Sequence, residues 1–315
     1  MDYREFTGAV EKEIRKRMKG GVQASLYTTV KNNGKERTGV LLQAPGVHVS
    51  PTIYLEDYYQ AYLEGKPIDR IAGEIECFYN SMRREVAWDC DQILNYEGIK
   101  DRIVFKLINT AANRDFLTTV PHYAFLDLSI VFYVLLEVTD EGTAAMVIGN
   151  DHAEQWRVET DTLWKAAVEN GKTLLPAEFF TMNHALKEML GETPANERGD
   201  GNLLLGETAD KDGMYVLSNK IRSYGAACIA YPHVLKMIGQ ILRKDYYILP
   251  SSVHEVVIVP WAPELRWSDL DDMVTEINAT QVAEEEVLSG HAYLYKWRSE
   301  RLLAGRGLPA ERRMG

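Results

Sequence analysis

Residues 214–260, MYVLSNKIRSYGAACIAYPHVLKMIGQILRKDYYILPSSVHEVVIVP, carry the densest apolar pattern in the chain and decide its fold. Short apolar, β-branched or aromatic runs occupy residues 215–217, 226–231, 246–249 and 253–259. Runs of this length, bounded by turn-forming residues, are typical of buried strands. We therefore predict four strands in this stretch.

A helix is expected between the second and the third of these strands. Leu235, Ile238 and Leu242 recur at helical spacing, and Pro232 precedes them at a position suited to a first helical turn. The stretch is thus interpreted as a β-β-α-β-β unit. A mostly antiparallel sheet with the helix across one face would bury its apolar side chains.

One compact polar cluster interrupts the apolar pattern: Ser251, Ser252, His254 and Glu255. Alternate residues of a strand share a face, so Ser252 and His254 are expected side by side, with Glu255 on the other face. One interpretation is structural: the serines satisfy a turn, and His254 is a hydrogen-bonded strand residue. The other is a site in which a serine acts with His254, helped by Glu255 or by Asn219 from the neighbouring strand.

The N-terminal part of the chain predicts hairpins packed with helices. Phe6, Val10 and Ile14 form the apolar stripe of a first helix. Strand-like residues on both sides of the Asn-Asn-Gly sequence at 32–34 predict a hairpin, because Asn and Gly tolerate positive φ. A long helix is expected at 67–82, where the apolar side chains keep helical spacing.

Several shorter elements are expected further along. Asp127 is interpreted as the residue that opens a strand of a second hairpin, with a buried acid as the less favoured alternative. Asp151, with Glu154 three residues later, fits the cap of a helix. Helices are also predicted at 88–96 and 180–190.

The composition is that of an ordinary globular protein, with 46% hydrophobic and 26% charged residues among 315. The formal net charge of -11 opposes a nucleic-acid partner. No apolar run has the length of a membrane helix, no signal peptide is recognisable, and the three cysteines lack metal-site spacing. We expect a cytoplasmic protein with reduced thiols, without metal or cofactor, and without nucleic-acid or membrane partners.

The polar segment 191–202, with its proline and glycines, is the best linker in the sequence. It would separate an N-terminal α+β domain, residues 1–190, from a smaller C-terminal α/β sandwich, residues 203–297. Residues 298–315 are rich in arginine and predict a disordered basic tail. The predicted fold class is α+β: antiparallel hairpins packed with helices, followed by the β-β-α-β-β unit.

Five segments together resemble a family of uncharacterised bacterial proteins, a domain of unknown function common in gut anaerobes. They are SPTIYL (50–55), VPHYAFLDLSIVFY (120–133), MYVLSNK (214–220), GAACIAYPHVL (225–235) and LPSSVHEVVIVP (249–260). The resemblance implies a cytoplasmic bacterial protein. It implies no reaction, ligand or catalytic residue.

Three hypotheses for function remain open. The preferred one is a non-enzymatic cytoplasmic binding or regulatory protein, with a protein partner or a second copy of the chain as possible partners. It is preferred because the rich core patterning comes without any common nucleotide, hydrolase or metalloprotease motif. The second is a hydrolase or transferase with its site at Ser251 or Ser252 and His254. The third is an interaction protein of mobile elements or host defence.

Overall fold

The computed structural model describes residues 1–45, 52–85, 95–139, 142–191, 201–206 and 212–305. Contacts within the chain divide it into two compact units, Met1–Gly98 and Ile99–Gly315. Every strand pair in both units is antiparallel, and helices pack on the sheets, so the fold is α+β as predicted. No helix in the described part of the chain combines the length and the apolar character that crossing a bilayer requires.

The described part of the first unit includes the helices α1, α2 and α3 and a three-stranded sheet in the order β1-β2-β3. Its elements are α1 (Tyr3–Arg17), β1 (Gln23–Val30), the 3-10 turn η1 (Asn32–Gly34), β2 (Glu36–Gln43), β3 (Thr52–Tyr54), α2 (Glu56–Leu63) and α3 (Ile68–Glu85). Asp2 caps α1 together with Glu5, and positive φ at Asn33 (59°) and Gly34 (72°) turns the β1–β2 hairpin.

The core of the first unit confirms the predicted helix stripes. Phe6, Val10 and Ile14 of α1 are fully buried, and they pack in one cluster with Ile71 and Ile75 of α3. These are the positions that share one face at a period of 3.6 residues. The described part of α3 also agrees with the helix expected at 67–82. The helix expected at 88–96 lies almost entirely outside the described residues.

The second unit begins with a four-stranded sheet in which β6 pairs with β4, β5 and β7. The short helix α5 (Tyr96–Ile99) spans the boundary between the two units. The elements that follow it are η2 (Lys100–Arg102), β4 (Ile103–Asn109), α6 (Arg114–Leu117), β5 (His122–Phe125), β6 (Leu128–Thr139), β7 (Gly142–Val147), α7 (Asn150–Trp156) and α8 (Thr160–Leu174). The hairpin β6–β7 is the second hairpin predicted from the sequence. Helix α8 covers this sheet, with Trp164 against Phe105 of β4.

A six-stranded sheet completes the second unit, in the order β14-β13-β11-β12-β10-β8. Its strands are β8 (Ala177–Thr181), β10 (Tyr215–Asn219), β11 (Tyr246–Leu249), β12 (Val256–Pro260), β13 (Tyr293–Lys296) and β14 (Arg301–Ala304). The helical elements around it are α9 (Met182–Met189), η4 (Leu203–Leu205), η5 (Gly225–Ala230), α10 (Val234–Leu242), α11 (Trp267–Thr280) and η6 (Glu284–Glu286).

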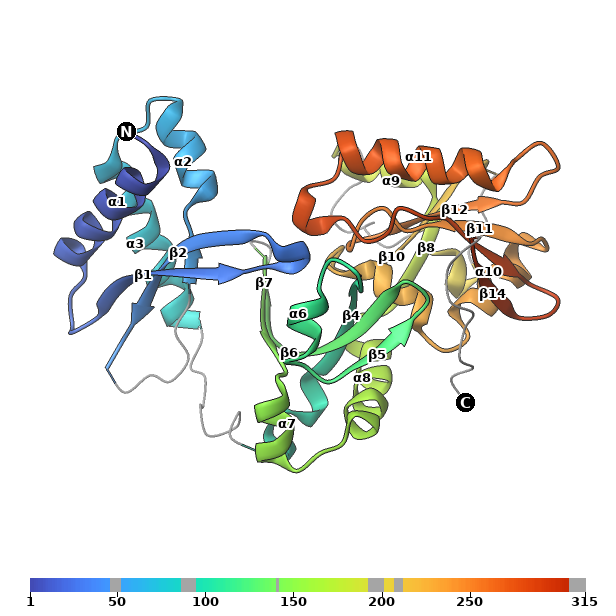
Figure 1. Ribbon diagram of the computed structural model, residues 1–315, viewed down its shortest axis with the longest axis horizontal. Helices are drawn as coiled ribbons and strands as arrows, with labels where there is room; N and C mark the ends of the chain where they lie inside the picture. The colour runs from blue at the N-terminus through green and yellow to red at the C-terminus, as the bar shows by residue number, and fades with distance from the viewer. Residues whose placement is uncertain (46–51, 86–94, 140–141, 192–200, 207–211, 306–315) are drawn as a thin grey trace. The chain divides into compact units, whose positions relative to one another are not determined.

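Two helices cover opposite faces of this sheet. Helix α11 lies along one face (Figure 1), where Leu270 and Val274 pack against a cluster that includes Tyr247 of β11. The neighbouring Tyr246 points to the other face, because adjacent strand residues alternate. Its hydroxyl donates to the carbonyl of Leu235 in α10 at 2.7 Å. Between the two sheets, η5 contacts β4 of one and β10 of the other, whereas α10 packs beside β13.

A polar seam joins the two sheets of the second unit. The carboxylate of Asp127 accepts hydrogen bonds from Ser289 Oγ at 2.7 Å and from the Tyr293 hydroxyl at 2.5 Å. Asn109 Nδ2 donates to the carbonyl of Leu288 at 2.9 Å. Burial, followed by the charge of Asp127, raises the pKa of Tyr293 well above its ordinary value. Asp127 precedes β6 as predicted, and its half-buried carboxylate also links that strand to β13.

Several sequence predictions need correction. Residues 226–231, predicted as a strand, lie almost wholly in the 3-10 helix η5. A helix was predicted at 180–190. In the structure Phe180 and Thr181 belong to the end of β8, and the helix α9 begins at Met182. The cap of α7 is Gly149 rather than Asp151, and the side chain that accepts the Gly149 N–H is His152, at 3.0 Å.

The predicted boundaries also differ from what the structure describes. Residues 301–304, expected in a disordered tail, form the edge strand β14 and pair with β13. On the two sides of the predicted linker, β8 and β10 pair with each other in one sheet, from Thr181 opposite Tyr215 to Ala177 opposite Asn219. Most of the linker itself lies outside the described residues, and its role as a domain boundary stays a prediction.

Candidate functional site

The polar cluster predicted as a possible site lies in the loop between β11 and β12. Ser251 is buried, and its carbonyl accepts the N–H of Leu288 at 3.0 Å. Ser252 forms a bridge with Val287, and its hydroxyl accepts the backbone N–H of His254 at 3.1 Å. Both serines therefore hold the loop to the segment 287–288. This geometry is the turn-forming role expected in the structural interpretation.

The ring of His254 is held by a backbone amide and a carboxylate. Its Nδ1 accepts the N–H of Tyr224 at 3.3 Å, and its Nε2 lies 3.3 Å from Glu286 Oε1. The ring also stacks on Tyr224, with 5.6 Å between the ring centroids. An acceptor role for Nδ1 assigns the proton to Nε2, where Glu286 accepts it. Among the described contacts, neither ring nitrogen bonds a serine hydroxyl.

The remaining two candidates do not join this ring. Asn219 turns its amide back on its own loop: Nδ2 donates to the Ser223 carbonyl at 2.8 Å, and Oδ1 accepts the N–H of Ile221 at 3.2 Å. Glu255 is exposed. The structure therefore brings Ser252 and His254 together through the backbone N–H of His254, which donates to the Ser252 hydroxyl, and not through the His254 ring. Their catalytic role stays a prediction.

The described surface is hollowed at another place, around Trp297. A hollow of about 280 Å³ is lined by Lys236, Gln240, Trp297, Arg298 and Glu300. A larger hollow of about 500 Å³ is lined by Lys244, Asp245, Trp261, Ala262, Pro263, Glu264, Trp297 and Arg298. The two hollows share Trp297 and Arg298 as lining residues, and we call them together the Trp297 hollow.

The sheet register explains why these residues meet. Tyr246 at the start of β11 pairs with Pro260 at the end of β12 and with Tyr295 near the end of β13. The segments that leave these three strands at the same end of the sheet are 244–245, 261–264 and 297–300. They come from distant parts of the sequence, and antiparallel pairing gathers them.

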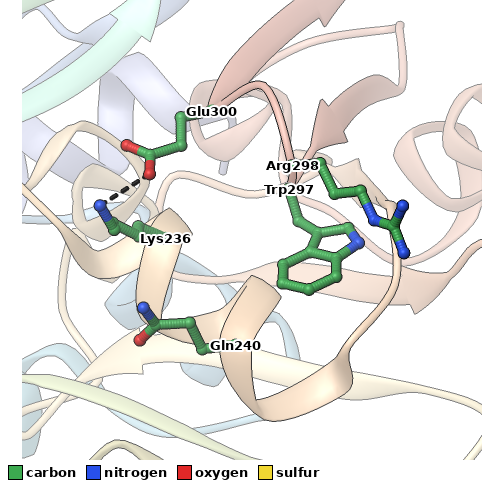
Figure 2. A pocket seen from close by; sticks show the side chains of 5 residues that line it. All are labelled: Lys236, Gln240, Trp297, Arg298 and Glu300. Atoms are coloured by element: carbon green, nitrogen blue, oxygen red, sulfur yellow. Dashed lines mark ion pairs between the residues drawn. The ribbon is translucent and has the colours of Figure 1, made fainter.

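Helix α10 forms the floor beside Trp297 because of one glycine. A Cβ built on Gly239 would lie 2.7 Å from the Cβ of Trp297, a distance that real Cβ atoms do not show. Glycine therefore lets the helix and the tryptophan approach closely. In Figure 2, Gln240 lies on α10 below the Trp297 ring, with Lys236 and Glu300 on one side of the ring and Arg298 on the other.

The charges around the Trp297 hollow fall into two groups. Lys236 pairs with Glu300 at 2.6 Å, and Lys296 pairs with Asp245 at 2.8 Å. Lys244 and Arg298 are exposed, and no ion pair is found for either among the described residues. The guanidinium of Arg298 lies 5.7 Å from the centroid of the Trp297 ring, within the range of a cation–π contact.

The sequence held one signal for this hollow. Trp261 follows the strand predicted at 253–259 after one proline, Trp297 is the last residue before the predicted tail, and Trp261 is 41% exposed. Large aromatic side chains at strand ends on the surface are typical of recognition sites. The signal was not interpreted, because residues from 298 onward were assigned to a tail. Lys236 and Gln240 carried no signal, because their part in the hollow depends on how α10 packs.

The structure describes an α+β protein with a tryptophan-lined surface hollow and with no cluster of metal-ligating side chains among its described residues. A family model described as a family of unknown function (DUF5688) matches residues 3–297. The chain belongs to that family, so the resemblance to a domain of unknown function is confirmed. No curated protein and no solved structure matches the chain.

Proposed function

We propose that the chain is a non-enzymatic binding protein and that its ligand occupies the Trp297 hollow. The observation that carries this proposal is that two hollows, of about 500 and 280 Å³, are both lined by Trp297 and Arg298. The larger volume is in the range of small-molecule sites, which are typically about 300–1,000 Å³. Its lining combines two tryptophans, Ala262 and Pro263 with four charged side chains. Aromatic side chains occur in such sites together with polar groups that fix the ligand's orientation.

One residue fixes both tryptophans in place. The carbonyl of Asp245 accepts the N–H of Trp261 at 2.8 Å, and its Oδ1 accepts the N–H of Trp297 at 3.1 Å. Its other carboxylate oxygen bonds Lys296. The segments that carry the two rings are therefore anchored before any ligand arrives. Such preorganisation lowers the entropic cost of binding.

The geometry around His254 supports binding over the hydrolase alternative. A serine nucleophile needs a base within hydrogen-bond reach. In the described contacts both nitrogens of His254 already have other partners, the Tyr224 amide and Glu286. The hydrolase hypothesis and the hypothesis of an interaction protein stay predictions without a supporting contact.

The cellular setting proposed is the bacterial cytoplasm, as the resemblance implies. In the described part of the chain Cys77 and Cys228 are free thiols, one exposed and one buried. Reduced thiols are usual in that compartment.

Binding is tested by nuclear magnetic resonance with a mixture of small aromatic fragments such as phenol, benzoate and pyridine. We expect the indole N–H signals of Trp261 and Trp297 to shift, and that of buried Trp156 to stay. Trp261→Ala should abolish the shift at Trp297, whereas Leu63→Ala, an exposed apolar side chain of the first unit, should not. Unchanged signals of both hollow tryptophans at millimolar fragment would refute the proposal.

A further inference from the structure

We infer that the ligand of the Trp297 hollow is an anion that carries a flat aromatic ring, with the ring on Trp261 and the anionic group between Lys244 and Arg298. This inference deepens the proposed function and depends on it. It is carried by three features of the hollow: two cations without an ion pair among the described residues, the position of one guanidinium and the exposed aromatic face.

The cations of the hollow are not all neutralised. Lys236 and Lys296 each have a carboxylate partner within 3 Å, whereas the described residues offer none to Lys244 or Arg298. One carboxylate without an ion pair, that of Glu264, also lines the larger hollow. The unpaired groups there therefore sum to a positive charge. In a chain of net charge -11 this is a local exception that favours an anionic ligand.

Arg298 is placed for recognition of an oxyanion. Its guanidinium lies over the Trp297 ring, 5.7 Å from the centroid, and the side chain is exposed. Contact with the ring restricts the side chain, so less conformational entropy is lost when it binds. A guanidinium matches the two oxygens of a carboxylate or a phosphate through parallel hydrogen bonds. Lys244 adds a second positive charge in the same hollow.

Trp261 supplies the surface for the ring. Its side chain is 41% exposed, and Ala262 and Pro263 continue the apolar wall beside it. Stacking on an indole favours flat aromatic groups, which pack against it with little loss of rotamer freedom. A hollow of about 500 Å³ holds one ring system and one anionic group. The shared chemistry is thus an aromatic phosphate or an aromatic carboxylate.

Five probes separate the parts of this inference: adenosine monophosphate, adenosine, ribose 5-phosphate, indole-3-acetate and tryptamine. We expect the first and the fourth, which are ring-bearing anions, to shift the indole signals of Trp261 and Trp297. Adenosine, ribose 5-phosphate and the cation tryptamine should bind at least about tenfold more weakly, because each lacks one of the two features. Which of the two anions binds more tightly, adenosine monophosphate or indole-3-acetate, shows whether the hollow prefers a phosphate or a carboxylate.

Matched variants locate the anionic group. Arg298→Gln and Lys244→Gln should each weaken the binding of the ring-bearing anions about tenfold and leave the binding of adenosine unchanged. Lys165→Gln removes an exposed charge from α8, outside the hollow, and should change nothing. Equal binding of adenosine or tryptamine overturns this inference and leaves the proposed function standing. Failure of all five probes to move either indole signal overturns this inference, and the proposed function falls with it only if phenol, benzoate and pyridine also leave both signals unchanged.

Discussion

Gly239 of α10 lies in contact with Trp297, so closely that a Cβ on the glycine would be 2.7 Å from the tryptophan Cβ. Gly239→Ala should therefore displace Trp297 and deform the hollow. We expect a loss of about 1–3 kcal/mol in the free energy of unfolding from overpacking. This exceeds the gain of about 0.5–1 kcal/mol that alanine brings to a helix interior. Urea denaturation measures the stability, and fragment titration measures the hollow.

Gly8→Ala is the matched control for that substitution. Gly8 lies inside α1, and a Cβ there would meet no heavy atom within 4 Å. The same chemical change should stabilise the protein by about 0.5–1 kcal/mol, because only the helix propensity changes. If Gly239→Ala were as well tolerated as Gly8→Ala, the close packing of α10 against Trp297 would be wrong.

His254→Ala tests the structural interpretation of the polar cluster. The substitution removes the acceptor of the Tyr224 N–H and the ring that stacks on Tyr224. We expect a loss of about 1–3 kcal/mol in stability, the cost of a buried or half-buried group that loses its partner. Ser252→Ala, which removes only the acceptor for the His254 N–H, should cost about 0.5–1.5 kcal/mol.

Neither substitution should affect fragment binding in the Trp297 hollow. Hydrolysis of p-nitrophenyl acetate by the wild-type protein should equal that of both folded variants. Hydrolysis above the buffer rate that disappears in Ser252→Ala, with melting temperature retained, would reinstate the hydrolase hypothesis.

Tyr293→Phe removes one of the two hydroxyl groups that donate to Asp127. Tyr293 is fully buried, so the carboxylate cannot replace that donor with water at the same position. We expect a loss of about 1–3 kcal/mol in the free energy of unfolding. Tyr247→Phe, at a buried tyrosine of the neighbouring strand β11, is the control and should cost less. Equal effects would show that the seam contributes little.

The phenol of Tyr123 should titrate later than an ordinary tyrosine. Burial and the hydrogen bond to Asp161 raise its pKa from 10.0 to about 12. The folded state then holds this proton more tightly than the unfolded state does. Its contribution to stability is complete below pH 10 and is lost as the pH rises through about 12.

Absorbance at 295 nm measures this titration. The difference between wild type and Tyr123→Phe should show one phenol that ionises near pH 12. Asp161→Asn should move that step towards lower pH, because the carboxylate is one cause of the shift. A step at pH 10 in the wild-type protein would contradict the hydrogen bond.

Periodic apolar patterns predicted much of the fold. The stripe of Phe6, Val10 and Ile14 predicted α1, and the Asn-Gly turn predicted the first hairpin. These signals are local in sequence, so they can be interpreted without knowledge of the tertiary structure. Strand β12 was found in the same way, because its β-branched residues 256–259 lie between turn residues.

The error at 226–231 has a physical cause. A short apolar run is compatible with a buried strand or a buried helical segment, and periodicity does not distinguish them. Here Tyr224 adopts a left-handed conformation at φ 54°, and Gly225 packs against the backbone of Asn219 and His254. Those tertiary contacts turn the chain into η5. Cys228 Sγ then donates to the carbonyl of Ser218 at 3.3 Å.

The candidate site was predicted less well than the fold. Ser252 and His254 were predicted side by side on a strand, but they lie in the loop before β12, where the Ser252 hydroxyl accepts the His254 N–H. What the His254 ring bonds depends on residues 224 and 286, far away in sequence. The Trp297 hollow depends on strand register, which decides that 244–245 and 297–300 meet. Register between distant strands is a property of the whole sheet, and no local pattern contains it.

The hydrogen bonds of Asp127 and Asn109 have a consequence for how the second unit comes apart. They tie β13 and the segment before it to β4 and β6, so neither sheet can open without breaking bonds held by the other. Amide protons of β6 and β13 should therefore exchange with deuterium at one common rate, as a single cooperative block. Local unfolding of either sheet would therefore also unfold the other in the same opening event.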